Sequence, residues 1–169
     1  NGSVKYIYNE AFADCISLTA ITLPNSEITL FDGAFKNAAS LNKVILAENT
    51  SFINTGSYVF NNTGIKEFKS NNNDYTVSAD GKLLMSENTL VFATSEIDSD
   101  YTIPASINKL GPSSLSACNN LVNITFASDI EITAGALSGL TKLENVTFNG
   151  NTIIGEYAFK DSTIKNIVN

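Results

Sequence analysis

Several residue types are absent from this 169-residue chain, and each absence narrows the range of possible functions. There is no histidine, which excludes Ser-His-Asp and Cys-His catalysis, histidine metal sites and the commonest general base. There is no arginine, so all ten basic residues are lysines and the forked group that binds phosphates and base edges is missing. With a net charge of −7, binding to nucleic acid or to an anionic membrane surface is not expected.

Long apolar runs and phosphate-binding glycine motifs are also lacking. No apolar stretch approaches the ~20 residues needed to span a bilayer, and no signal peptide is visible. Neither the P-loop motif nor the dinucleotide-binding glycine motif occurs. Hydrophobic residues make up 43% of the chain, enough for the core of one domain. The chain begins at Asn1, without Met, and ends inside a repeat, so we expect a segment of a longer protein.

The dominant feature of the chain is an internal repeat of apolar residues. Phe12 is followed six, nine and eleven positions later by Leu18, Ile21 and Leu23. The same spacing follows the anchor residues Phe35, Leu115 and Leu137, and a version one residue shorter follows Phe60 and Phe159. A period of about 20–29 residues with an L-x-x-L-x-L core is typical of a leucine-rich-repeat solenoid.

Each repeat is predicted to hold two extended segments that bury their apolar residues by stacking on neighbouring repeats. Ile21 and Leu23 share one face of a strand because they lie two positions apart, and Thr22 points to the other face. Stacked strands of successive repeats then form a parallel sheet over a continuous core. An apolar residue five positions before most anchors, as at Ile7 and Ile154, predicts a second extended segment on the outer side.

Residues 7–24 resemble a known family of repeats. They closely follow the phrase I-g-x-x-A-F-x-x-C-x-x-L-x-x-I-x-[IL]-P, which is typical of the BspA-type leucine-rich repeats of bacterial surface proteins. The resemblance covers nearly the whole chain and implies a right-handed leucine-rich-repeat solenoid of the α/β horseshoe class. It further implies a β-rich fold with short helical or 3-10 turns and a parallel sheet on one face. A cell-surface or extracellular location in a bacterium, a link to adhesion and an absence of catalytic residues are also implied.

The repeats divide a single domain, residues 1–169, at regular intervals. Six repeats are expected at about 7–27, 28–51, 52–70, 101–126, 127–148 and 149–169. Between the third and the fourth, at about 71–100, three short extended runs are separated by turn residues, among them Asp80-Gly81. We expect this insertion to form a small β-meander that interrupts the solenoid.

The two cysteines occupy the same column of the repeat, which faces the core in the resembling family. Cys15 and Cys118 lie at least three coils apart, so about 4.8 Å per coil separates them by roughly 14 Å or more. This exceeds the limit of about 7 Å for a disulfide. Both are therefore predicted to be buried free thiols.

The densest acidic cluster of the chain is formed by Glu96, Asp98 and Asp100. Their oxygens could hold a Ca²⁺ ion, but the spacing lacks the glycine and the distal glutamate of an EF-hand, and a solvated loop is the alternative. Carboxylates that could pair for glycoside hydrolysis are few. We expect a non-enzymatic protein with no catalytic residue, no cofactor and no established metal site.

The outward-pointing residues of the predicted strands form the candidate partner face. One column holds Thr22, Ile45, Lys69, Thr125, Thr147 and Val168, and the other holds Ala20, Lys43, Glu67, Asn123, Asn145 and Asn166. This composition suits the recognition of a protein or a glycan, and it equally suits a plain solvated sheet.

These patterns support one hypothesis and leave two alternatives open. The hypothesis is a monomeric, non-enzymatic protein-binding or adhesion module of a bacterial surface or secreted protein, whose partner is a host matrix protein or another surface protein. The first alternative is a structural spacer. The second is a glycan-binding accessory module, which would need an aromatic-lined groove near Tyr75, Phe92 and Tyr101.

Overall fold

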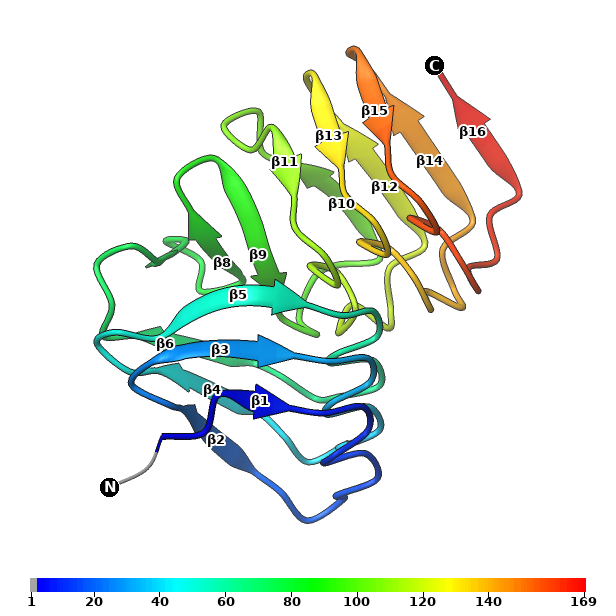
Figure 1. The fold of residues 1–169 in the computed structure, drawn as a ribbon. Helices are drawn as coiled ribbons and strands as arrows, with labels where there is room; N and C mark the ends of the chain where they lie inside the picture. Colours follow the sequence, from blue (N-terminus) through cyan, green and yellow to red (C-terminus); the bar gives the residue numbers. More distant parts are fainter. Residues whose placement is uncertain (1–2) are drawn as a thin grey trace.

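The computed structural model describes residues 3–169, which wind into a β-solenoid (Figure 1). One series of strands, here called the face strands, comprises β2 (Ala20–Leu23), β4 (Lys43–Leu46), β6 (Glu67–Ser70), β10 (Asp100–Ile103), β12 (Asn123–Phe126), β14 (Asn145–Phe148) and β16 (Asn166–Val168). The opposite series, the outer strands, comprises β1 (Tyr6–Ile7), β3 (Glu27–Leu30), β5 (Ser51–Thr55), β9 (Thr89–Ala93), β11 (Lys109–Leu110), β13 (Ile130–Ile132) and β15 (Thr152–Ile154). Neighbours within each series pair in parallel except β5 with β9 and β6 with β10, and this parallel stacking confirms the predicted leucine-rich-repeat solenoid.

The core lies between the two series and consists of the residues that define the repeat. In β12 and β14 the residues paired in register are Ile124 with Val146 and Phe126 with Phe148, and all four are buried. The anchor residues Phe35 and Phe60 are also buried, with their rings stacked 5.3 Å apart between centroids. Coil-to-coil stacking of like residues therefore removes the apolar columns from water, which is the main driving force for the fold.

Left-handed turns, not helices, connect the outer strands to the face strands. The short helical or 3-10 turns that the family resemblance implies are not formed in residues 3–169. The same residues contain no helix that could cross a membrane. Two columns of the turns have φ between 55° and 77°: Glu10, Gly33, Tyr58, Ser113, Gly135 and Tyr157 in one, and Asp14, Asn37, Asn62, Gly139 and Asp161 in the other. A right-handed helix cannot continue through a left-handed residue, so each turn ends before a helix develops.

A break after β6 divides the solenoid into two stacks of coils. No strand pairing joins β5 to β9 or β6 to β10 within the described residues, and the second stack runs steeply across the first (Figure 1). Within a stack, a turn N–H donates to a carbonyl of the next coil, as Phe35 does to Val59 at 2.9 Å. At the break, the N–H groups of Val59 and Phe60 instead donate to the hydroxyls of Ser113 and Ser116, at 3.3 and 3.2 Å.

The insertion is the β-meander expected from the sequence. Strands β7 (Thr76–Val77), β8 (Leu83–Ser86) and β9 pair antiparallel in succession. Strand β9 also pairs in parallel with β11, so the last strand of the meander begins the second stack. Phe92 of β9 packs edge-on against Phe60 at 4.9 Å between centroids, which carries the core through the break.

The prediction for the cysteines is half wrong. Both thiols are free, and Cys118 is buried as expected, but Cys15 is exposed. Cys15 belongs to the first coil, which packs against a neighbour on one side only. Its anchor Phe12 is 37% exposed for the same reason, whereas the equivalent Phe35 is fully buried. Position in the repeat therefore determines burial only where coils lie on both sides.

Candidate functional site: the face strands

The structure places every residue of the candidate partner face on a face strand, and none of them is buried. The two columns are in register across paired strands, as Ala20, Lys43 and Glu67 are in the first stack. The two columns do not run through one continuous sheet, however, because β6 and β10 do not pair. The face consists of two separate sheets, β2-β4-β6 and β10-β12-β14-β16.

Charge dominates the face of the first sheet. Lys43 lies 3.1 Å from one carboxylate oxygen of Glu67, and Lys69 lies 3.3 Å from the other. The contact with Lys43 is the main cause that lowers the pKa of Glu67. All three side chains are at least a quarter exposed, so we expect the network to contribute little to stability and to remain accessible to a partner.

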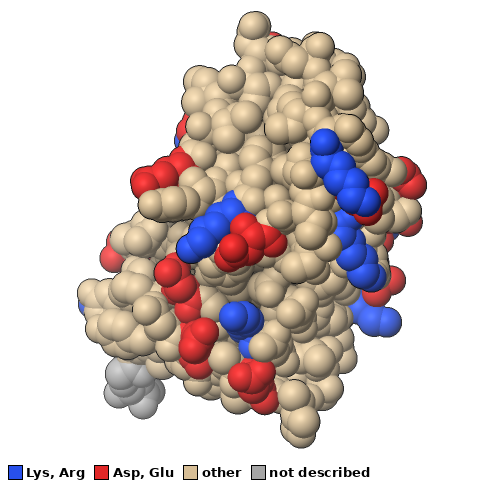
Figure 2. Space-filling view, turned by 90° about the vertical axis from the view of Figure 1, so that its right-hand side faces the viewer, with Lys and Arg blue, Asp and Glu red and all other residues tan. Residues whose placement is uncertain are grey.

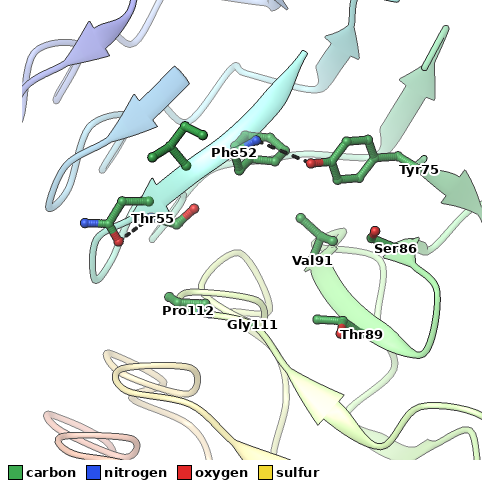
Figure 3. A pocket seen from close by; sticks show the side chains of 10 residues that line it. Phe52, Thr55, Tyr75, Ser86, Thr89, Val91, Gly111 and Pro112 are labelled. Carbon is green, nitrogen blue, oxygen red and sulfur yellow. Dashed lines mark hydrogen bonds between the residues drawn. The ribbon is translucent and has the colours of Figure 1, made fainter. Parts of the chain in front are cut away.

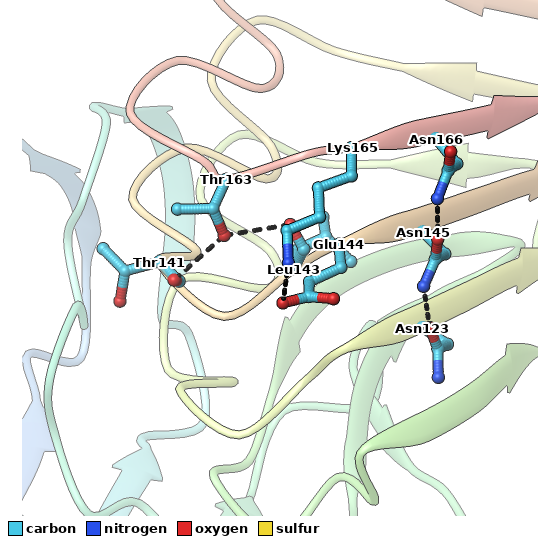
Figure 4. Close-up of polar contacts among 8 residues, drawn as sticks. All are labelled: Asn123, Thr141, Leu143, Glu144, Asn145, Thr163, Lys165 and Asn166. Atoms are coloured by element: carbon cyan, nitrogen blue, oxygen red, sulfur yellow. Dashed lines mark hydrogen bonds and ion pairs between the residues drawn. The ribbon is translucent and has the colours of Figure 1, made fainter.

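A ladder of asparagines lies on the second sheet (Figure 4). Asn166 Nδ2 donates to Asn145 Oδ1 at 2.7 Å, and Asn145 Nδ2 donates to Asn123 Oδ1 at 2.6 Å. Asn123 Nδ2 in turn donates to a carboxylate oxygen of Asp100, at the foot of the ladder. Beside the ladder, Thr125 and Thr147 form a register pair that is half-buried. The face of this sheet is therefore polar, mostly uncharged and fixed in spacing by the strands.

The structure adds two residues, Asp100 and Thr102, to the columns predicted for this face from the sequence. Asp100 pairs with Asn123 and Thr102 pairs with Thr125, so β10 adds one more row to the second sheet. The sequence does contain a signal for this additional row. Tyr101 and Ile103 lie two positions apart just before Pro104, as Ile21 and Leu23 do before Pro24 in the first repeat. The 55-residue interval between the anchors Phe60 and Leu115 concealed this row, because it holds both the meander and an additional coil.

The three carboxylates of the acidic cluster point to different partners. Glu96 lies 3.7 Å from Lys66, Asp98 lies 2.9 Å from Lys82, and Asp100 accepts a hydrogen bond from Asn123. Residues 3–169 contain no group of three or more histidine, cysteine, aspartate or glutamate side chains placed to hold a metal ion. The sequence cluster is therefore not a spatial one.

The glycan-binding alternative needs an aromatic-lined groove near the insertion, and the groove found there is lined by only one of the three residues named for it. Tyr75 lines a groove of about 300 Å³ between β5 and β9 (Figure 3). Phe92 is 2% exposed and lies in the core, and Tyr101 lies on the face strand β10. Phe52 of β5 supplies the second aromatic ring of the groove.

Positive and negative side chains are interspersed on one side of the molecule (Figure 2). Figure 2 shows the right-hand side of Figure 1, where most lysines have an acidic neighbour and the upper part carries almost no charge. Several ion pairs join consecutive coils, as do Lys109 with Glu131 at 2.8 Å and Lys165 with Glu144 at 2.7 Å. This side therefore has no single-sign patch that would attract a highly charged partner.

Comparison with known proteins agrees with this architecture. No curated protein sequence matches the chain. A leucine-rich cell surface protein from Faecalibacterium prausnitzii A2-165 has a similar fold, with a TM-score of 0.53 and 15% identity over 85% of this chain and 51% of the other. The chain thus spans about half the length of that protein. The pneumococcal vaccine antigen PcpA gives a TM-score of 0.41 and 14% identity over 96% of this chain and 74% of its own.

The family assignment rests on the sequence profile of the repeats. The profile of the BspA type leucine-rich repeat region matches residues 1–80 and 84–168 in six copies. These ranges contain both stacks and all of the meander except residues 81–83, so nearly every coil carries the repeat. The chain belongs to the family of BspA-type leucine-rich-repeat proteins.

Proposed function

We propose that the chain is a non-enzymatic protein-binding module of a bacterial cell-surface or secreted protein, and that it binds its partner through the face strands. The observation that carries this proposal is the ordered array of accessible polar side chains on two sheets. Strands hold these side chains in fixed register, so a partner meets a preorganised surface and little conformational entropy is lost on binding. Membership of a family of surface proteins supports the same proposal.

The two face sheets offer different chemistry to a partner. The first presents the alternating charges of Lys43, Glu67 and Lys69, and the second presents the amides and hydroxyls of Asn145 and Thr147. Such a surface favours a polar partner of mixed charge, for which a host matrix protein or another surface protein is the expected class. Neither sheet carries an aromatic platform, which is why we place a protein before a sugar on this face.

The proposal is tested by measuring binding of the segment to a panel of extracellular-matrix and bacterial surface proteins. The variant Lys43→Glu/Thr125→Lys/Thr147→Lys alters both sheets and leaves the net charge unchanged. Its matched control is Lys109→Glu/Thr76→Lys/Thr152→Lys, which makes the same exchanges away from the face strands. We expect saturable binding of at least one panel protein that is lost in the first variant and kept in the second.

The outcomes separate the proposal from the spacer alternative. Binding that survives both variants would move the interaction away from the face strands. A complete lack of saturable binding across the panel would favour a structural spacer that projects other parts of a longer protein.

A further inference from the structure

The groove at the break of the solenoid is a product of the fold and not a surface irregularity. Its first wall is β5, whose edge facing the groove pairs with no strand among the described residues. Its second wall is formed by Ser86, Thr89 and Val91 at the end of β8 and along β9, and its floor by Gly111 and Pro112 (Figure 3). In an unbroken solenoid β9 would pair with β5, so the groove occupies the space left by that missing contact.

An unpaired strand edge usually invites a further strand, but this edge is blocked. The N–H groups of Ser51 and Gly56 donate to Ser26 and Leu30 on the side of β3. Because adjacent N–H groups alternate sides, those of the neighbouring Phe52 and Thr55 point away from β3. The first donates to the hydroxyl of Tyr75 at 3.3 Å, and the second to Oδ1 of Asn54 at 2.9 Å. The pairing of β5 with β3 is also irregular at Ile53. Capped donors and a bulge are devices that prevent strand addition, so an extended peptide is a poor occupant.

The lining of the groove is amphipathic and uncharged. None of its ten residues carries a charge, and the apolar part comes from Phe52, Tyr75, Val91 and Pro112 among others. Four polar side chains complete the lining: Asn54, Thr55, Ser86 and Thr89. The hydrogen bonds formed within residues 3–169 leave Asn54 Nδ2 and the hydroxyls of Thr55, Ser86 and Thr89 without a protein partner. By contrast, the amides of the face strands are joined in a ladder.

From this lining we infer that the groove is a binding site for a neutral saccharide. A pyranose ring presents hydroxyls around its edge and C–H groups on its faces, which matches four unpaired polar groups beside two aromatic rings. A volume of about 300 Å³ lies at the small end of ligand sites and suits one sugar residue of a glycan.

Other occupants fit the lining less well. A purely apolar side chain would bury the four polar groups without partners, at a cost of about 1–3 kcal/mol for each group that becomes fully desolvated. A uronic or sialic acid would place a carboxylate where no lysine lines the groove, and burial of an unpaired charge is unfavourable. The site is also separate from the face strands, so a glycan and a protein partner can bind together.

The inference is tested with ligand-observed saturation-transfer NMR and calorimetry on the whole chain. The probes are neutral methyl glycosides of glucose, galactose, mannose and N-acetylglucosamine, with glucuronic acid as the charged comparison. The variant Thr89→Phe fills the groove, and Thr152→Phe is its matched control on the outer strand β15. The variant Asn54→Asp keeps the oxygen that caps the N–H of Thr55 but replaces the free donor by a negative charge.

We expect at least one neutral glycoside to bind with a millimolar dissociation constant and glucuronic acid to bind more weakly. Affinity should fall about tenfold or more in Thr89→Phe and in Asn54→Asp and should be unchanged in Thr152→Phe. The inference is overturned if no neutral glycoside binds at millimolar concentration. It is equally overturned if Thr152→Phe weakens binding as much as Thr89→Phe.

Discussion

At the scale of single residues, the two cysteines have the same place in the repeat and opposite environments. Cys118 lies in the core of the second stack, and burial raises the pKa of its thiol. Cys15 lies on the first coil and is exposed. The difference comes from the number of neighbouring coils, which a repeat alignment does not record.

A thiol-specific reagent should distinguish the two cysteines in the native protein. Because only Cys15 is accessible, we expect one thiol to react rapidly and the second to react only when the chain unfolds. Mass spectrometry of peptides after brief labelling identifies the modified residue. Equal labelling of both cysteines under native conditions would contradict the burial of Cys118.

The buried thiol also makes stability depend on pH in the alkaline range. In the unfolded chain the thiol ionises near pH 8.5, whereas in the folded protein it stays protonated because its pKa is raised. The folded state then binds more protons, so this contribution to stability is complete below about pH 8.5 and is lost as the pH rises further. The free energy of unfolding should fall by up to about 1.4 kcal/mol per pH unit from this group.

Denaturant unfolding between about pH 8 and 9.5 checks this slope. The variant Cys118→Ala serves as the control because it lacks the thiol. We expect it to be less stable than the native chain at every pH. Its free energy of unfolding should depend less on pH than that of the native chain. Parallel curves for the two proteins would show that the thiol does not ionise differently in the two states.

At the scale of elements, the strands were more predictable than the turns and the break. Spacings of two between apolar residues placed the face strands, because a strand buries alternate side chains over a core. The turns carried a signal as well: the column Asp14, Asn37, Asn62 and Asp161 holds residue types that tolerate a left-handed backbone. The other left-handed column gave a mixed signal, since it holds Gly33 and Gly135 but also Tyr58 and Tyr157. Position in the repeat, not residue type, determines the backbone there.

The left-handed turn column predicts an unusual order of substitution effects at Asn37. Its backbone has φ 60°, and its side chain donates to Asp14 and accepts from Asn62, both at 3.0 Å. Asn37→Gly removes these hydrogen bonds only, at about 1 kcal/mol. Asn37→Ala removes the same hydrogen bonds and keeps a Cβ at a left-handed backbone, without the polar side chain that lets asparagine tolerate it, so it should cost about 1 kcal/mol or more beyond the glycine variant.

Thermal or denaturant unfolding of the two Asn37 variants tests this order. In most exposed positions of a regular element, alanine is the milder substitution and glycine the more destabilising one. We expect the reverse here. An alanine variant as stable as the glycine variant would mean that the turn changes its backbone conformation at little cost.

At the scale of the whole molecule, the break determines the shape. The sequence indicates an insertion, but it does not indicate that the face strands stop pairing, because this depends on how the meander packs. Tyr58 at the junction donates its hydroxyl to Asp161 of the last coil at 2.7 Å, and burial together with this carboxylate raises its pKa to about 12. Hydroxyls of the coil that joins β11 to β12 replace the carbonyl acceptors of a regular stack.

The junction predicts different effects for two serines that have equivalent positions in successive coils. Ser116 and Ser138 each follow an anchor leucine and are buried. Ser138 donates to Gly135 within its own coil, whereas Ser116 accepts from the N–H of Phe60 across the break. Ser116→Ala leaves that N–H without its acceptor, so we expect a loss of about 1–3 kcal/mol in the free energy of unfolding.

The matched variant Ser138→Ala should cost less, because it removes a hydrogen bond within its own coil and leaves no backbone N–H without an acceptor. Small-angle X-ray scattering provides a second measurement: Ser116→Ala should change the overall dimensions of the molecule, and Ser138→Ala should not. Equal effects of the two substitutions on stability and on dimensions would contradict the assigned role of the break.

The central claim is that a partner binds across the face strands, and site-specific photo-crosslinking tests it most directly. A photoreactive residue is placed at Thr22 on the first face sheet, at Thr147 on the second, and at Thr152 on an outer strand as the control. Each protein is irradiated with the panel protein that it binds most tightly. We predict covalent capture from Thr22, Thr147 or both, and none from Thr152. Capture from Thr152 alone would contradict the claim.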